Sequence, residues 1–159
     1  MACVVKPPTP IPPKNTPHVF LAGSIEMDRA APWQDHVGQA LHDLAVTLLN
    51  PRRDSWDETW TQRMTHPEFR SQVAWELDGL EGADLILLYF DPDTQAPISL
   101  LELGLFARSR KILVGCPDGY WRKGNVEVVC ARYEVPLFNT LDALIQAARG
   151  RLSALGKNV

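Results

Sequence analysis

The 159-residue sequence lacks most of the features that would assign a protein to a functional class at first sight. No apolar run approaches the length of about 20 residues that a membrane-spanning helix needs. The net charge is −3, and no basic stripe is present that would bind nucleic acid or a membrane surface. The cysteines and histidines show no metal-ligand spacing, and neither GxGxxG nor a P-loop motif occurs. These absences argue against a membrane protein, a nucleic-acid binder, a zinc protein and a P-loop nucleotide binder.

Cysteine is scarce as well, with three residues and no CxxC pair. We expect Cys3, Cys116 and Cys130 to be free thiols, and the protein to be cytoplasmic, because a reducing compartment disfavours disulfides. Hydrophobic residues make up 45% of the chain and charged residues 22%, so one globular domain can bury a core without disulfides.

Strand-like and helix-like segments alternate after residue 17. The continuous apolar run at 84–90 is typical of a parallel strand covered on both faces. We therefore predict an α/β fold: a doubly wound (Rossmann- or flavodoxin-like), mostly parallel five-stranded sheet with helices on both faces. The expected strands are 18–24, 45–51, 84–90, 111–116 and 135–138, and the expected helices are 31–44, 67–83, 98–109, 126–133 and 140–155.

The first 17 residues hold six of the thirteen prolines. Proline removes a backbone donor and fixes φ, so we expect no regular element there. The sequence thus predicts a proline-rich arm at 1–17, disordered or draped over a neighbour, followed by one α/β domain at 18–159.

Glu102 is the one ionisable residue in the apolar stretch "ISLLELGLFA" at 98–107. One interpretation is structural: Ser99 and Glu102 fit a capping box, S-x-x-E. The other is functional: a carboxylate in the first turn of a helix faces the ligand crevice, kept ionised by the helix N-terminus, as nucleophile or base. The residues alone leave both open.

Other candidates lie where the predicted strands end, which is where doubly wound sheets bind ligands. Gly23 and Ser24 suit either a tight turn or a cradle for a sugar or phosphate. Asp91 and Asp93 are either loop formers or proton donors over the crevice. Glu76 falls among apolar residues of its predicted helix, and is either solvated or part of the site.

The polar loop at 52–66 carries Asp54, Trp56 and Trp60 behind two arginines. Aromatic rings beside donors and acceptors suit a flat heteroaromatic ligand, through stacking and edge hydrogen bonds. The alternative is that the tryptophans pack on the core.

Four segments, "VFLAGSIE", "LLNPRRDSW", "WELDGLEGADLILLYF" and "PISLLELGLFA", together resemble the nucleoside 2-deoxyribosyltransferase family and its 2′-deoxynucleotide N-hydrolase relatives. The resemblance runs from about residue 18 to 130. It implies transfer of 2-deoxyribose between a deoxyribonucleoside and a free nucleobase, without a metal or organic cofactor. It also implies a homo-oligomer with shared active sites, a dimer or a tetramer or hexamer of dimers, which the apolar helix at 98–109 favours.

The resemblance assigns roles to individual residues. Glu102 matches the nucleophile that attacks C1′ of the deoxyribose, and Glu76 stands where an acidic residue lies close to the nucleoside. Asp93 best matches the aspartate that handles the proton of the base, although Asp91 could serve instead. Asn125 resembles an asparagine that a neighbouring subunit lends to the 5′-hydroxyl.

Two departures from the family pattern qualify this assignment. Phe20 replaces a tyrosine that hydrogen-bonds the nucleophile in many members. Ser99 is closer to Glu102 than the phosphate-binding serine of the hydrolase branch, which favours nucleosides over nucleotides.

Three alternatives remain at this point. The first is a hydrolase of 2′-deoxynucleoside 5′-monophosphates, with Arg52, Arg53 or Arg122 binding the phosphate. The second is a non-enzymatic α/β module in which Glu102 only caps its helix, and the third is a NAD-cleaving relative.

Overall fold

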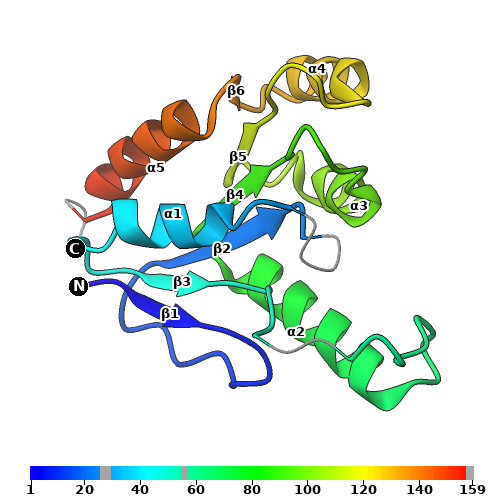
Figure 1. Cartoon of the computed structure of the whole chain (residues 1–159). Helices are drawn as coiled ribbons and strands as arrows, with labels where there is room; N and C mark the ends of the chain where they lie inside the picture. The colour runs from blue at the N-terminus through cyan, green and yellow to red at the C-terminus, as the bar shows by residue number, and fades with distance from the viewer. Residues whose placement is uncertain (26–29, 55–56, 157–159) are drawn as a thin grey trace.

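The computed structural model describes residues 1–25, 30–54 and 57–156, and within these ranges the strands form one parallel sheet in the order β1-β3-β2-β4-β5-β6 (Figure 1). Every pairing is parallel, which confirms the predicted α/β class. The strands are Cys3–Val5 (β1), His18–Gly23 (β2), Thr47–Leu49 (β3), Leu85–Tyr89 (β4), Ile112–Gly115 (β5) and Leu137–Phe138 (β6).

Helices cover both faces of the sheet, as predicted. In the described ranges they are Trp33–Ala40 (α1), Pro67–Gly82 (α2), Pro97–Phe106 (α3), Lys123–Arg132 (α4) and Leu141–Leu155 (α5). Alternation along β2 shows the two layers: Val19 and Leu21 pack with α1 and α5, whereas Phe20 and Ala22 pack with α2, α3 and α4 (Figure 1). None of these helices is long and apolar enough to cross a membrane.

The strand order predicts a ligand crevice at the carboxyl ends of β2 and β4. β2 pairs with β3 on one side and with β4 on the other, so the chain reverses its winding direction between β2 and β4. Ligands of doubly wound sheets bind at such a switch point. Ser24 and Asp91 follow these two strands, so two of the predicted site residues flank it.

The N-terminal arm contradicts one prediction, because Cys3–Val5 forms β1 and pairs with Thr47–Leu49 along the sheet edge. The sheet therefore has a sixth strand, formed by residues that precede the first proline of the arm. The sequence did not predict β1, because three residues are too few to show a periodic pattern.

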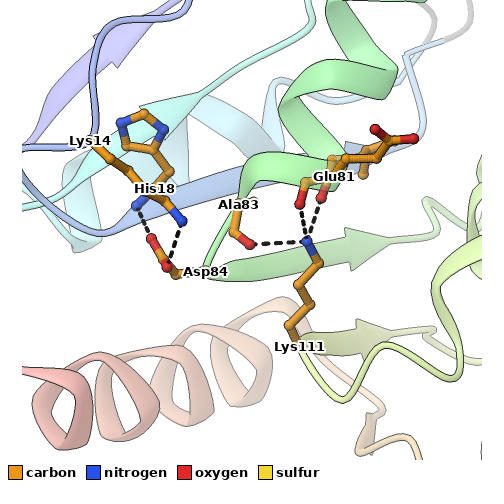
Figure 2. A network of polar contacts seen from close by, with 7 residues as sticks. Lys14, His18, Glu81, Ala83, Asp84 and Lys111 are labelled. Atoms are coloured by element: carbon orange, nitrogen blue, oxygen red, sulfur yellow. Dashed lines mark hydrogen bonds and ion pairs between the residues drawn. The ribbon is translucent and has the colours of Figure 1, made fainter.

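Polar contacts connect the residues that precede the central strands β2, β4 and β5 (Figure 2). Lys14 of the arm donates to Asp84 at 2.8 Å, and the same carboxylate accepts the backbone N–H of His18 at 2.9 Å. Lys111 Nζ donates to the backbone oxygens of Leu80 (2.7 Å), Glu81 (2.7 Å) and Ala83 (3.0 Å). It thereby satisfies carbonyls that the end of α2 leaves without partners.

Candidate active site

The floor of the crevice is a hydrogen-bonded corner between β2 and β4. Ser24 is buried, and its Oγ accepts the backbone N–H of Asp91 at 2.9 Å and the hydroxyl of Thr94 at 2.7 Å. Its own N–H donates to Tyr89 O at 3.0 Å. Ser24 thus holds the loop that follows β4 against the end of β2, so its hydroxyl has a structural task besides the predicted substrate contact.

The close contact between the ends of β2 and β4 requires glycine at position 23. Its φ is +141°, which side-chain-bearing residues rarely adopt, and a Cβ there would collide with the backbone oxygen of Tyr89. The close approach of β2 to β4 leaves no room for a side chain, so glycine sets the width of the crevice floor.

The two candidate aspartates lie in different environments. Asp91 is buried, and its carboxylate accepts the N–H of Ala31 at 3.0 Å and that of Asp93 at 2.9 Å. Both oxygens of Asp91 are therefore engaged in shaping the loop. Asp93 is exposed two residues further along the same loop.

Glu102 is the sixth residue of α3, because the helix begins at Pro97, one residue earlier than predicted. The capping-box interpretation is wrong: the N-cap is Ala96, and no side chain caps this helix. The expectation of a carboxylate in the first turn is also wrong, since that turn contains no acidic residue. Proline at N1 fixes φ for a helix start, which places Glu102 in the second turn.

Glu102 and Glu76 form an electrostatically coupled pair between α3 and α2. Burial, reinforced by the negative charge of Glu76, raises the pKa of Glu102 to about 8. Burial also raises the pKa of Glu76, opposed by a hydrogen bond from Gln72. Both side chains are partly buried, and within the described residues no hydrogen bond to the Glu102 carboxylate is found. The pair therefore retains a proton near neutral pH, as expected for two carboxyls that share one apolar site.

A polar relay that the sequence did not reveal holds Glu76. Arg53 donates to Gln72 Oε1 at 2.7 Å, and Gln72 Nε2 donates to Glu76 Oε1 at 2.8 Å and to Pro51 O at 3.2 Å. Gln72 is buried, and it lies one helical turn before Glu76. Glutamine four residues before glutamate is the signal that could have found this pair.

Phe20 lies in the core beneath the crevice, fully buried against α2. Its ring is 6.1 Å from that of Trp75, and a Cβ on Gly79 would collide with it. This position supplies no phenol oxygen, so Glu102 is not oriented from β2. The predicted substrate contact of Phe20 would require its ring to become exposed.

The structure describes the loop after β3 except for residues 55 and 56. Asp54 is exposed and pairs with Lys6 at 2.6 Å, and Trp56 lies outside the described residues. Arg53 stacks over the ring of Trp60 at 4.9 Å. A pocket of about 380 Å³ opens here, lined by Pro7, Pro8, Arg53, Trp60, Pro67, Glu68, Ser71 and Gln72.

Asn125 lies in the first turn of α4. It is exposed in a groove of about 310 Å³ between α3 and α4, lined by Leu100, Leu103, Gly104, Arg122, Asn125, Val126 and Val129. Neither Glu76 nor Glu102 lines this groove.

The described ranges contain no group of three or more His, Cys, Asp or Glu side chains able to hold a metal ion. The candidate residues are instead a partly desolvated carboxyl pair on α2 and α3, two aspartates in the loop after β4, and an amide relay that holds Glu76. Carboxylates in this arrangement are equipped for nucleophilic attack on a sugar carbon and for proton transfer to a leaving group.

Comparison with known proteins shows the family of the chain. No curated protein matches the chain. The family model described as "Nucleoside 2-deoxyribosyltransferase like" matches residues 16–120, which is more than half of the chain and includes both glutamates of the pair. The chain belongs to the nucleoside 2-deoxyribosyltransferase-like family.

Proposed function

We propose that the protein is a nucleoside 2′-deoxyribosyltransferase that moves 2-deoxyribose between nucleobases through a covalent deoxyribosyl–Glu102 intermediate. The observation that carries the proposal is the coupled Glu102–Glu76 pair beside the crevice of a family member. Burial raises the pKa of Glu102 to about 8, so the resting carboxyl is neutral near pH 7 and becomes the nucleophile when it releases that proton.

The proposed reaction has two displacements at C1′. Glu102 attacks C1′ while the C1′–N bond breaks, and the departing base takes a proton from Asp93. In the second step a new base attacks C1′, the bond to Glu102 breaks, and the proton of the incoming base returns to Asp93. Each step inverts C1′, so the product regains the β configuration.

The arginines proposed for a monophosphate are engaged within the chain. Arg52 donates to Ala30 O at 3.0 Å and Ala31 O at 3.3 Å, and Arg53 donates to Gln72. Arg122 stacks on Trp121 at 4.3 Å, in the groove remote from the pair. This engagement favours a nucleoside over its 5′-monophosphate as the substrate.

The test is to incubate the protein with deoxyinosine and adenine and follow the products by HPLC. We expect deoxyadenosine and hypoxanthine without free deoxyribose, because transfer requires that water be kept from the intermediate. Free deoxyribose would instead indicate a hydrolase, and the same assay with dIMP would then identify a monophosphate substrate. Absence of any product from either substrate would refute the proposal.

We further propose that the enzyme is a homodimer, or a higher assembly of dimers, with shared sites. Ile98, Leu101 and Leu105 form an apolar stripe on α3 and are 58%, 59% and 57% exposed. This stripe borders the groove that contains Asn125, so a second copy packed on α3 would bury it and receive Asn125.

Subunit mixing tests the shared sites. Glu102→Gln and Asn125→Ala are each expected to be inactive or weak alone. In a hybrid dimer one site has both defects, but the other combines an intact Glu102 with an intact Asn125. Mixing equal amounts with subunit exchange should therefore restore about a quarter of wild-type activity. If each chain builds its own complete site, mixing will restore nothing.

A further inference from the structure

The N-terminal arm lies mostly outside the segment that the family model matches, yet it is fixed to the rest of the chain. β1 pairs with β3, and Asn50 N–H donates to Val5 O at 2.9 Å. Further along, Trp75 Nε1 of α2 donates to Thr9 O at 2.8 Å, and Ile11 packs on the core. The arm is therefore attached at both ends of the stretch between residues 5 and 9.

That stretch forms one wall of the 380 Å³ pocket. Pro7 is buried and Pro8 is exposed, and both line the pocket opposite α2. Lys6 pairs with Asp54 at 2.6 Å, which ties the arm to the loop after β3 on the same side. The wall is built of proline rings on a backbone held in place from both directions.

The same pocket is joined to the carboxylate pair through one side chain. Gln72 lines the pocket with its neighbours on α2, and its Nε2 donates to Glu76 Oε1 at 2.8 Å. A molecule seated against Gln72 is thus separated from Glu76 by a single amide. Gln72 therefore belongs both to the pocket lining and to the relay that holds Glu76.

The lining suits a flat heteroaromatic molecule. Pro7, Pro8 and Trp60 offer flat apolar surfaces, and proline contributes no backbone N–H that would need a partner. Ser71 offers a hydrogen-bond donor to the edge of a ring. A volume of about 380 Å³ lies within the range of small-molecule sites.

We propose that residues 6–9 of the arm form a wall of the nucleobase site and contribute to the choice of base. The proposal rests on the transferase function proposed above. It assigns a role to a segment that the family match does not include.

Two variants test the wall from opposite sides. Pro8→Ala removes a ring from the arm, and Ser71→Trp fills the pocket from α2. Both residues are exposed, so both variants should fold. We expect each to raise the KM for the acceptor base about five- to tenfold, with a much smaller change in kcat, and to alter the ratio between purine and pyrimidine acceptors.

The matched controls are Pro13→Ala, at an exposed proline of the same arm outside the pocket, and Ser153→Trp, at an exposed position on α5. Both should behave as the wild type does. Wild-type KM and base preference in Pro8→Ala and Ser71→Trp would overturn the proposal.

Calorimetric titration with adenine separates this proposal from the transferase assignment. If the wild type binds adenine and both variants bind it at least about fivefold more weakly, the arm is a wall of a base site even if no nucleoside is turned over. If the wild type turns nucleosides over and the variants bind adenine equally well, the transferase stands and the wall does not. Absence of both turnover and adenine binding overturns both proposals.

Discussion

Replacing Glu102 with glutamine is expected to reduce deoxyribosyl transfer by at least about a thousandfold. The amide has nearly the same shape as the carboxyl but cannot attack C1′, so the covalent intermediate does not form. The HPLC assay measures the loss of transfer. Mass spectrometry of the denatured protein, after brief exposure to deoxyinosine, should show a deoxyribosyl adduct on the wild type and none on Glu102→Gln.

The same substitution is expected to stabilise the fold at alkaline pH. The pKa of Glu102 is raised from 4.5 to about 8 on folding, so the folded state holds a proton that the unfolded state releases. The contribution of this group to stability is therefore complete below about pH 4.5 and is lost as pH rises to about 8 and beyond. Glutamine has no proton to lose, so Glu102→Gln should be more stable than the wild type by about 1–3 kcal/mol at pH 9.

Urea denaturation at pH 5 and pH 9 measures this difference, with Glu127→Gln, at an exposed glutamate of α4, as the control. The control should show neither the loss of activity nor the gain in stability. A glutamate that only supported the helix would behave oppositely, since its removal would lower stability and leave turnover intact. Retention of transfer by Glu102→Gln would falsify the nucleophile assignment.

The second large effect is expected for Asp93→Asn, which should slow transfer from ordinary purine nucleosides by about 10²–10⁴-fold. The asparagine cannot supply the proton that the departing base needs. A nucleoside whose purine is methylated at N7 carries a positive charge and leaves as a neutral base without that proton. Its cleavage should therefore be nearly unaffected, and comparing kcat for the two substrates measures the difference.

Asp118→Asn, at an exposed aspartate paired with Lys123, provides the control and should leave both substrates unchanged. If Asp93→Asn slows the two substrates equally, the residue binds substrate rather than donating the proton. If it slows neither, Asp91 becomes the candidate acid, despite the two backbone N–H groups that its carboxylate accepts.

The elements of the domain could be predicted because each carries a pattern that local physics imposes. The run at 85–90 is apolar throughout because β4 is covered on both faces, and Pro67 marks the observed start of α2. β1 could not be predicted, because its three residues form a strand only by pairing with β3, far along the chain. Its stability comes from tertiary pairing rather than from local preference.

The candidate site, too, could be predicted from the sequence only in part. The types of residue at the strand ends pointed to Glu102 and the aspartates, but not to their protonation or partners. The start of α3 at Pro97 moved Glu102 out of the first turn, and burial beside Glu76, rather than the helix end, dominates its pKa. The role of Gln72 depends on Arg53, which reaches it from a loop almost twenty residues away. Such a bond is a property of the folded chain.

β1 also determines how the sheet meets its surroundings. Without Cys3–Val5, the backbone N–H and C=O groups of Thr47–Leu49 along that edge would lose their partners, and an uncovered strand edge is a template for pairing with other chains. With β1 in place, the edge is only three residues long and is followed by Pro7 and Pro8. Proline has no backbone N–H to donate to a neighbouring strand, so the arm disfavours pairing of this sheet edge with another chain.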